Sequence, residues 1–552
     1  MKKFTWLLVG VCALTFFAGL GTTALWEPDE PRFAEATRQM LLRHDYVTPW
    51  FNQRPRFEKP VLLYWLQLPF FALLGPTEAA ARMPAALAGL IAVLATFGIA
   101  RELVSPRAGV LAGVTLATTL RFVLYARQGL TDVPVVAAVA CAIWAMTRAL
   151  RPRGVDERNG RRFAYLAWIF VGAAILLKGP VGFFAPIVWT VQALLSGGRR
   201  ALARTRPIGG AAIAAALALP WFAVMYAMHG SAFLDVALGY EVMARYLDEE
   251  FPGRDRGFFY FWGVWLGDGL PWSLFLLPAL GWAYARRKAI SGGEAAAMRL
   301  SAVWFLAVLF LFSLSSYKLP HYILPAYPAM ALAVGVFFNA AVEGRIPGIL
   351  WRVPAGLAAL ALAACAVLLW LLLSRAFELS LPDPSFVLPS IIGAGALVTA
   401  VLLVRRGVRA LEVFSALAAT MVLCYACLAT LVASRELRRF QPIPALAAAA
   451  RQVVAPSEPL AVAGNYGAPG LIFYARHPVQ QLEHQAALLE YLSGPGRRHV
   501  VLPESELDQV RPQLTRPVRV QAQAGVFSVR MRRLLESEPQ RAGRVLLLVT
   551  VE

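Results

Sequence analysis

The chain has 552 residues, of which 58% are hydrophobic and only 16% are charged, and its mean hydropathy is +0.58. This composition excludes an ordinary soluble globular protein and indicates a membrane protein with many spans. The formal net charge of +20 would also suit nucleic-acid binding. However, much of the basic excess lies in short loops between hydrophobic runs, and no basic-aromatic nucleic-acid module is recognisable. We therefore expect membrane lipids, and no nucleic acid, as partners.

Thirteen hydrophobic runs are candidate transmembrane helices. The first follows Met1-Lys2-Lys3, which resembles the start of a signal peptide. Its length and the polar stretch after it favour an uncleaved first helix. The sequence thus predicts a mainly α, polytopic membrane domain over residues 1–435. The runs lie at about 5–25, 79–101, 106–124, 132–149, 163–178, 180–197, 208–228, 259–284, 299–316, 322–341, 352–373, 386–404 and 409–433.

Basic residues set the predicted orientation, because short loops rich in lysine and arginine stay on the cytoplasmic side. If the N-terminus lies inside and successive spans cross the membrane in alternating directions, nearly every basic short loop also lies inside. We therefore expect a multi-pass protein of a bacterial inner membrane, with a cytoplasmic N-terminus and its other face in the periplasm. The inside loops carry Arg101 and Arg107, the cluster from Arg148 to Arg162, the group from Arg199 to Arg206, then Arg286 to Lys288, and Arg405 to Arg409.

The first outer loop, about residues 26–78, begins with Trp26-Glu27-Pro28-Asp29-Glu30-Pro31-Arg32-Phe33. Apolar residues at helical spacing predict an amphipathic helix that lies on the membrane surface and runs on to Leu42. A second juxtamembrane element is predicted to begin at Val61. The acidic residues have two readings, which are compatible: they cap this helix, or they belong to an active site at the membrane surface.

Other outer segments also carry polar residues at the ends of predicted helices. Because these segments share one face of the membrane, their side chains could converge on a single site. The loop over residues 229–258 is polar and contains glycine, so we predict that it is mobile. The segments contain Asp132 next to Pro134, Lys178 next to Gly179, Arg245 within the 229–258 loop, and the run Tyr317-Lys318-Leu319-Pro320-His321-Tyr322.

Hydropathy falls after about residue 435. In residues 436–552, short apolar β-like runs alternate with helix-like stretches, which predicts a small α/β domain on the outer face. The β-like runs are 460–463, 499–502, 518–520 and 545–551, and the helix-like stretches are 443–454, 484–492 and 504–513.

Asp29 and Asp132 are the candidate catalytic carboxylates, and several cations share their face. A helix cap remains an alternative for either aspartate alone, since Thr-Asp-Val-Pro around Asp132 fits one well. Lysine and arginine at helix ends suit a phosphate, although Lys178 could instead snorkel to the interface. The cations are Arg56, Lys59, Lys178, Arg245 and Lys318.

A divalent metal ion is a weaker candidate. Glu58 and His321 could contribute ligands, but two ligands do not define a site, so no cofactor is required. The chain has no Gly-rich nucleotide-binding loop between a strand and a helix, which argues against a soluble nucleotide donor.

At these positions the chain resembles the GT-C superfamily of glycosyltransferases that use polyprenyl phosphates, and among them the lipid A 4-amino-4-deoxy-L-arabinose transferases. The resemblance covers the membrane part well. For the C-terminal domain it extends only to the position of that domain after the membrane part. Phe33 departs from an expected tyrosine and His321 from an expected threonine. The matching pieces are Leu25-Trp26-Glu27-Pro28-Asp29-Glu30 with Arg32-Phe33-Ala34-Glu35, Phe57-Glu58-Lys59-Pro60 with Tyr64-Trp65, Asp132 before Pro134, Lys178-Gly179, Arg245-Tyr246, and Lys318-Leu319-Pro320 with Tyr322-Ile323-Leu324.

The resemblance implies that a monomeric enzyme transfers aminoarabinose from undecaprenyl phosphate to a lipid A phosphate at the periplasmic face, which gives resistance to polymyxin. Since that phosphate is already ionised, one aspartate would pair with the 4-amino group or the oxocarbenium charge rather than act as a base. The implied site comprises Asp29 and Asp132 as catalytic residues, Lys59, Arg56, Arg245 and Lys178 at the donor phosphate, and Glu30, Arg32, Tyr317, Lys318 and Tyr322 as substrate contacts. Glu27 and Glu30 have a plainer alternative, in which they cap the helix or orient Arg32.

Two other functions remain open. A protein mannosyltransferase that uses a polyprenyl phosphate would share this scaffold, but its Ser or Thr acceptor would need a base. A lipid carrier or flippase would be expected to have charges midway through its spans. The charges lie at span ends instead, which argues against transport.

Overall fold

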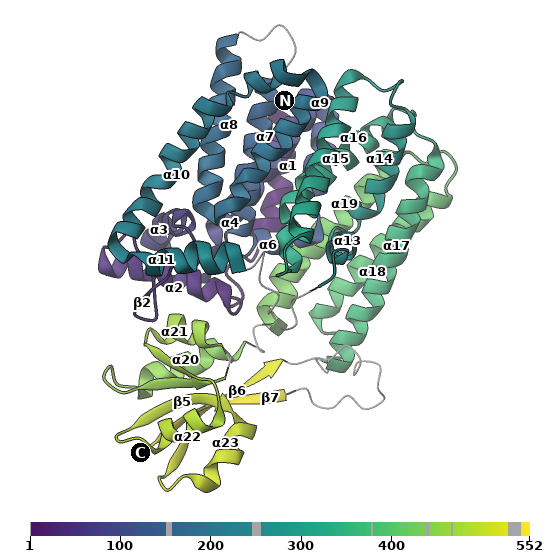
Figure 1. Cartoon of the computed structure of the whole chain (residues 1–552). Helices are drawn as coiled ribbons and strands as arrows, with labels where there is room; N and C mark the ends of the chain where they lie inside the picture. Colours follow the sequence, from purple (N-terminus) through teal and green to yellow (C-terminus); the bar gives the residue numbers. More distant parts are fainter. Residues whose placement is uncertain are drawn as a thin grey trace.

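The chain folds into a large helical bundle with a small α/β domain at one end, and the N-terminus lies at the opposite end of the bundle (Figure 1). The computed structural model describes residues 2–150, 157–244, 256–376, 379–437, 441–464, 467–527 and 543–552. The predicted mainly α membrane fold with a small C-terminal sheet domain is confirmed.

Long apolar helices build the membrane part, with short 3₁₀ or π segments (η) where a helix bends or changes pitch. Capping side chains fix several starts: Thr77 accepts from Ala80 N, and Ser105 accepts from Ala108 N. The elements are α1 (Lys2–Cys12), η1 (Ala13–Phe17), α2 (Asp29–Arg43), β1 (Trp50–Phe51), β2 (Arg54–Pro55), α3 (Leu62–Leu74), α4 (Glu78–Leu103), α5 (Pro106–Ala117), α6 (Leu120–Ala126), α7 (Asp132–Ala149), α8 (Glu157–Lys178), η2 (Gly179–Phe183), α9 (Phe184–Arg204), α10 (Pro207–His229), α11 (Ser231–Leu234), η3 (Asp235–Ala244), α13 (Tyr260–Asp268), η4 (Trp272–Phe275), α14 (Leu276–Ala285), α15 (Gly292–Ser313), η5 (Pro320–Ala326), α16 (Tyr327–Val342), α17 (Gly348–Leu371), η6 (Leu372–Ala376), η7 (Pro384–Phe386), α18 (Val387–Val404), α19 (Ala410–Cys427) and η8 (Leu428–Leu437).

Among the described residues, nine helical runs are long and apolar enough to cross a membrane, or ten if the bent pair α5–α6 is one span. One run, Glu157–Arg204, contains both α8 and α9 and therefore covers two of the predicted spans. The predicted spans 5–25 and 259–284 correspond to α1–η1 and to the broken run α13–η4–α14. Each predicted span thus coincides with helix, while thirteen crossings stay a prediction.

Helix α16 forms the core of the bundle, and its apolar window is wholly buried. It packs against α4, α5 and α15. Gly335 permits the close approach to α5, because a Cβ there would lie 2.5 Å from the backbone nitrogen of Ala112. Helices α17 and α18 are mostly exposed, as expected for helices that face lipid. The segment η5, which leads directly into α16, is therefore anchored to the buried core of the bundle.

Helices α2, α3 and α11 lie across the end of the bundle that faces the α/β domain (Figure 1). The amphipathic helix predicted after the first span is confirmed as α2, which buries Phe33, Ala36 and Met40. The second predicted juxtamembrane element is α3. The loop predicted to be mobile begins with helix (α11 and η3), and residues 245–255, including Arg245, lie outside the described residues.

The α/β domain contains a five-stranded mixed sheet in the order β4-β3-β5-β7-β6. Strand β3 is parallel to β4 and β5, and β7 is antiparallel to β5 and β6. Alternate residues of β3 face opposite sides, so Val462 packs with α20 and α21 while Ala461 packs with α22 and α23. The elements are α20 (Pro442–Val453), β3 (Leu460–Ala463), α21 (Ala468–Ala475), β4 (Val479–Leu482), α22 (Gln485–Ser493), β5 (Arg498–Pro503), α23 (Glu504–Val510), η9 (Arg511–Gln513), β6 (Val518–Phe527) and β7 (Gly543–Val551).

The α/β domain docks on the chain segment that leads into α2. At the start of α21, the Gly470 N–H donates to Glu27 Oε1 at 2.7 Å. Leu25 N–H donates to the Tyr474 hydroxyl at 2.9 Å. Further hydrogen bonds join Ala24 to Gln441 and Asn52 to Val479. The domain therefore holds the acidic segment that contains Asp29.

Candidate active site

Asp132 and Lys178 meet at the end of the bundle that faces the α/β domain. Asp132 is the first residue of α7, Lys178 is the last residue of α8, and Lys178 Nζ lies 2.5 Å from Asp132 Oδ1. The helix dipoles favour an anion at the first position and a cation at the last. The N-cap of α7 is Thr131, which makes no side-chain capping bond. The Asp132 carboxylate thus bonds to a lysine across two helices instead of capping its own helix.

His321 reaches the same carboxylate from η5. Its Nε2 lies 3.8 Å from Asp132 Oδ1. The imidazole stacks on the Tyr125 ring at a centroid distance of 5.1 Å and meets the edge of Tyr322 at 5.1 Å. Lys178 Nζ lies 5.4 Å from the centroid of Tyr322. One carboxylate therefore stands between a lysine and a histidine, with aromatic rings on two sides.

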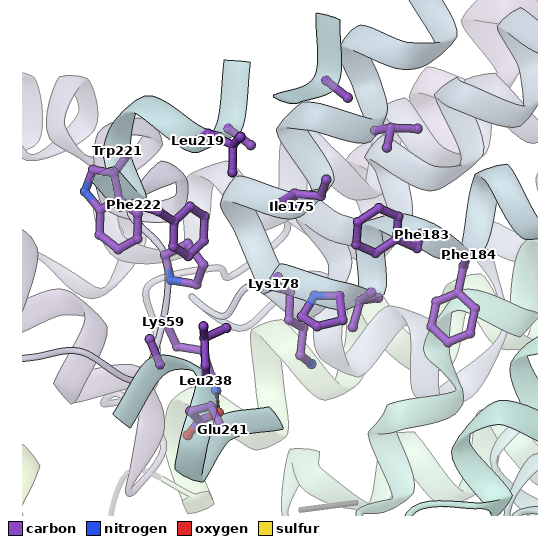
Figure 2. A pocket seen from close by; sticks show the side chains of 18 of the residues that line it. Lys59, Ile175, Lys178, Phe183, Phe184, Leu219, Trp221, Phe222, Leu238 and Glu241 are labelled. Carbon is purple, nitrogen blue, oxygen red and sulfur yellow. Dashed lines mark hydrogen bonds and ion pairs between the residues drawn. The ribbon is translucent and has the colours of Figure 1, made fainter. Parts of the chain in front are cut away.

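A cavity of about 690 Å³ opens beside this cluster, and Lys178 lies on its wall (Figure 2). Apolar side chains from α8, η2, α9 and α10 form most of its surface, and η3 and α15 complete it. Four charged residues also line it: Glu58, Lys59, Lys178 and Glu241. Such a groove suits a long apolar chain with an anionic head. The apolar lining includes Trp168, Ile175, Phe183, Phe184, Leu219, Trp221, Phe222 and Leu238.

Lys59 forms an ion pair with Glu241 of η3 inside this cavity (Figure 2). Their side chains are only 18% and 10% exposed. Lys59 follows the β1–β2 hairpin and precedes α3, so the juxtamembrane elements place it on the cavity wall. The two cavity lysines therefore come from separate parts of the chain, and each has a carboxylate partner.

Asp29 lies at the rim of the cluster rather than within the cavity wall. It is the first residue of α2, its side chain is 56% exposed, and its Oδ1 lies 3.8 Å from an Arg32 nitrogen. Its charge is within electrostatic range of His321 and Tyr125. The Arg32 side chain is partly exposed, so both residues can meet a ligand from the aqueous side.

Glu30 has a different environment from its neighbour Asp29. It is 1% exposed and forms a two-point salt bridge with Arg82 of α4, at 3.0 and 2.9 Å. It also accepts hydrogen bonds from the N–H groups of Trp26 and Gly129. We therefore assign Glu30 a structural role in place of the predicted substrate contact. Its partner is Arg82, not Arg32 as the sequence suggested.

Other predicted site residues are packed into the supporting structure. Arg56 is buried, lies 4.6 Å from the Phe33 ring centroid and approaches Glu58 at 3.4 Å. Lys318 is buried and donates to the carbonyl of Ser315. Tyr317 is buried behind Tyr322, at a centroid distance of 6.2 Å. Of the substrate contacts predicted at 317, 318 and 322, only Tyr322 lines the large cavity.

A second, more polar cavity of about 270 Å³ lies on the other side of Tyr125. Its wall includes Arg82, Arg121 and Arg127. Arg121 pairs with Asp268 at 2.5 Å. Tyr125 lines this cavity and also stacks on His321. The Asp132 cluster thus lies between an apolar cavity and a basic one.

The residues present do not fit a metal site at Glu58 and His321. Glu58 faces Arg56, whereas His321 faces Asp132. Throughout the described ranges, no group of three or more His, Cys, Asp or Glu side chains is placed to hold a metal ion. We derive no step through one.

The sequence reasoning missed Glu241, Arg82, Arg121 and Tyr125. Glu241 precedes Arg245 by four positions in the sequence, and Arg82 is an arginine near the start of an apolar helix. Both patterns could have drawn attention, because charges in apolar surroundings need partners. Neither pattern names the partner. The predicted phosphate ligand Arg245 lies outside the described residues.

The order and packing of these helices correspond to those of a solved structure. The crystal structure of ArnT from Cupriavidus metallidurans bound to undecaprenyl phosphate aligns with 99% of this chain and 98% of its own, with a TM-score of 0.77 and 22% identity. At this identity the likeness establishes the fold.

Residues 58–224 match the family model described as dolichyl-phosphate-mannose-protein mannosyltransferase. The chain is also similar to two proteins named undecaprenyl phosphate-alpha-4-amino-4-deoxy-L-arabinose arabinosyl transferase. It is 29% identical over 305 residues to that of Edwardsiella ictaluri (53% of each chain), and 30% identical over 304 residues to that of Pseudomonas aeruginosa (52% of each chain). These matches span about half the length of either relative. They confirm the resemblance to GT-C polyprenyl-phosphate glycosyltransferases.

Proposed function

We propose that the chain transfers 4-amino-4-deoxy-L-arabinose from undecaprenyl phosphate to a lipid A phosphate. The observation that carries this proposal is the apolar cavity with Lys59 and Lys178 on its wall, next to Asp132. The fold shared with ArnT and the partial match to named aminoarabinose transferases support the sugar and the carrier. Added aminoarabinose reduces the negative charge of lipid A, which weakens the binding of polymyxin and other cationic peptides.

The donor's polyprenyl chain would lie along the apolar wall, and its phosphate would lie between Lys59 and Lys178. Lysine binds phosphate as a point charge, and the surrounding apolar side chains strengthen that attraction by excluding water. Arg245, which follows η3 in the sequence, is proposed as a third phosphate ligand.

In the transfer step, the bond between the anomeric carbon and the donor phosphate oxygen breaks, and its electron pair leaves with the phosphate. An oxygen of the acceptor phosphate forms the new bond to that carbon. Lys59 and Lys178 stabilise the charge on the departing phosphate. Asp132 and Asp29 stabilise the positive charge of the sugar ring or its 4-amino group. No base is required, because the acceptor phosphate is already ionised.

The basic cavity beyond Tyr125 supports an anionic acceptor. Arg121 and Arg127 on its wall would attract a lipid A phosphate. The partly exposed Arg32 follows Trp26, another residue of this wall, by six positions and would add to the attraction. Tyr125 lines the basic cavity and stacks on His321, which lies beside Asp132, so an acceptor in the basic cavity would lie close to the Asp132 cluster. Tyr317 and Lys318 are proposed to support Tyr322 and the 315–318 turn.

The same proposal includes an orientation. The acidic segment 26–30 and the α/β domain would lie in the periplasm, and the N-terminus would lie in the cytoplasm of a bacterial inner membrane. The distribution of basic loops supports this direction. The described chain is consistent with it, because the N-terminus and the α/β domain lie at opposite ends of the bundle (Figure 1).

A protein mannosyltransferase is the second candidate, and one observation favours it. His321 lies 3.8 Å from Asp132, and a histidine beside a carboxylate suits a base for a Ser or Thr hydroxyl. The family model matched by residues 58–224 has a mannosyltransferase description.

Mass spectrometry of products made by the purified chain separates the two candidates. With undecaprenyl-phosphate-aminoarabinose and lipid A, we expect lipid A that has gained one aminoarabinose. The Asp132→Asn variant is the matched control and should give none. Unchanged lipid A, together with hexose transferred from polyprenyl-phosphate-mannose to a Ser- or Thr-containing protein, would overturn the first proposal in favour of the second.

A further inference from the structure

Among the described residues, the two lysines that line the large cavity and the nearby Arg56 are each paired with a carboxylate of the chain. Lys59 pairs with Glu241, Lys178 pairs with Asp132, and Arg56 pairs with Glu58. These three pairs balance the charge of the cavity before any donor enters. A donor phosphate brings a further negative charge into apolar surroundings, where an uncompensated charge is costly. A donor phosphate that binds Lys59 or Lys178 must therefore change the pair that this lysine already forms.

The Lys59–Glu241 pair is the one suited to change. Both side chains line the cavity where a donor phosphate would enter. In Figure 2 the Glu241 carboxylate points to the Lys59 ammonium. The Lys178–Asp132 pair, in contrast, is fixed by two packed helices and by His321. Glu241, in contrast, does not belong to a long packed helix. It lies in the ten-residue π segment η3, which follows the four-residue helix α11.

We propose that Glu241 competes with the donor phosphate for Lys59. When the cavity is empty, its carboxylate neutralises the lysine. When the donor binds, the phosphate takes over Lys59 and Glu241 must release it. After transfer, Glu241 recovers Lys59 and helps to expel undecaprenyl phosphate, the lipid product. This inference rests on the proposed function and adds a residue that sets donor affinity and product release.

The competition has an unusual consequence for mutagenesis: removing a charged residue from the cavity should tighten ligand binding. In Glu241→Gln, Lys59 loses the carboxylate of this pair, so undecaprenyl phosphate should bind about tenfold more tightly if the competing contact is worth about 1.4 kcal/mol. Turnover should then fall, because the product leaves more slowly, and added undecaprenyl phosphate should inhibit at lower concentration. A residue with a merely structural role would weaken binding instead.

The test is a double-mutant cycle on the full chain in detergent, with undecaprenyl phosphate titrated by calorimetry. The four proteins are the parent chain, Glu241→Gln, Lys59→Ala and the double variant. Glu241→Gln should tighten binding in the parent background and have no effect once Lys59 is alanine. Glu58→Gln is the charge-matched control, since it removes the same charge from the same cavity but not from Lys59. It should tighten binding clearly less than Glu241→Gln.

The possible results separate this inference from the proposed function. If Glu241→Gln binds undecaprenyl phosphate no more tightly than the parent, or if the gain persists without Lys59, the competition is overturned while the donor site stands. An equal gain from Glu58→Gln would also overturn it, because long-range charge would then explain both. If the parent chain does not bind undecaprenyl phosphate at all, the proposed function itself fails.

Discussion

Lys178 Nζ lies 2.5 Å from Asp132 Oδ1, although the two residues are 46 positions apart in the chain. The contact forms because the start of α7 lies beside the end of α8. Each residue alone has a purely structural explanation. Asp132 could cap its helix, and Lys178 could extend its side chain to the membrane interface. Their contact at the side of an apolar cavity makes both explanations insufficient, since a cap would bond to its own helix and a snorkelling lysine would reach water.

Asp132→Asn should reduce transfer by about a thousandfold or more, the loss seen when a buried electrostatic group of an active site is removed. Binding of undecaprenyl phosphate should remain measurable, because Lys59 is untouched. The measurement is single-turnover transfer alongside calorimetric binding. Glu343→Gln, just after the end of α16, is a suitable control, since Glu343 also forms an ion pair with a basic residue, Arg107. Transfer at the parent rate in Asp132→Asn would exclude Asp132 from catalysis.

Asp29→Asn should also abolish transfer. It should leave thermal stability almost unchanged, because the Asp29 side chain is 56% exposed. An exposed ion pair such as Asp29–Arg32 contributes at most about 1 kcal/mol. Activity and melting temperature measured on the same preparation test both halves of this expectation. Activity retained at the parent level would remove Asp29 from the catalytic set.

Glu30→Gln should show the opposite behaviour, with a large loss of stability. The change leaves the buried Arg82 guanidinium without its counter-ion, which typically costs about 3–5 kcal/mol. Thermal unfolding in detergent is the measurement, and Asp29→Asn, one residue away, is the control. A melting temperature close to that of the parent would show that Glu30 does not have the structural role assigned to it.

Docking of the α/β domain should depend on pH through Glu27. Desolvation raises the pKa of the Glu27 carboxyl from 4.5 to about 7 although the residue keeps an exposed surface, and the Gly470 N–H and Arg32 act in the opposite direction. The docked state therefore binds the proton more tightly than the undocked state. The contribution of Glu27 is fully present below about pH 4.5 and is lost as the pH rises through about 7.

Distances between spin labels on α20 and on the bundle, measured on either side of neutral pH, test this dependence. The docked population should be larger on the acidic side. Glu27→Gln should flatten the profile, because an amide does not titrate. A profile that is equally steep in Glu27→Gln would assign the dependence to another group.

Gly470→Ala should displace the Glu27 carboxylate, the end of a flexible side chain, and so remove this one docking contact. A Cβ at this position would lie 2.1 Å from Glu27 Oε1, and the next nearest atom belongs to Ile443. Gly525→Ala is the matched control, because a Cβ there has no atom within 4 Å. We expect faster proteolysis between the bundle and the domain in Gly470→Ala only. Equal cleavage in both variants would mean that the Glu27 contact is not needed for docking.

The helices could be predicted because length and hydropathy are local properties. The predicted spans 79–101 and 132–149 coincide with α4 and α7 to within a few residues. In the α/β domain, the β-like runs match β3, β5, β6 and β7. Strand β4 was missed because Val479–Leu482 has two glutamines at its centre and reads as a loop. Helix α21 was missed because it is only eight residues long.

The sequence by itself determined which segments are helical and which of them share a face. It also singled out Asp132, Lys59 and Lys178, because charges at the ends of apolar runs are rare and conspicuous. Only the tertiary structure decided the partners of these charges. Lys59 meets Glu241 across 182 positions, and Glu30 meets Arg82 across 52. Such pairings depend on how helices pack in three dimensions, and no local pattern of residues encodes that packing.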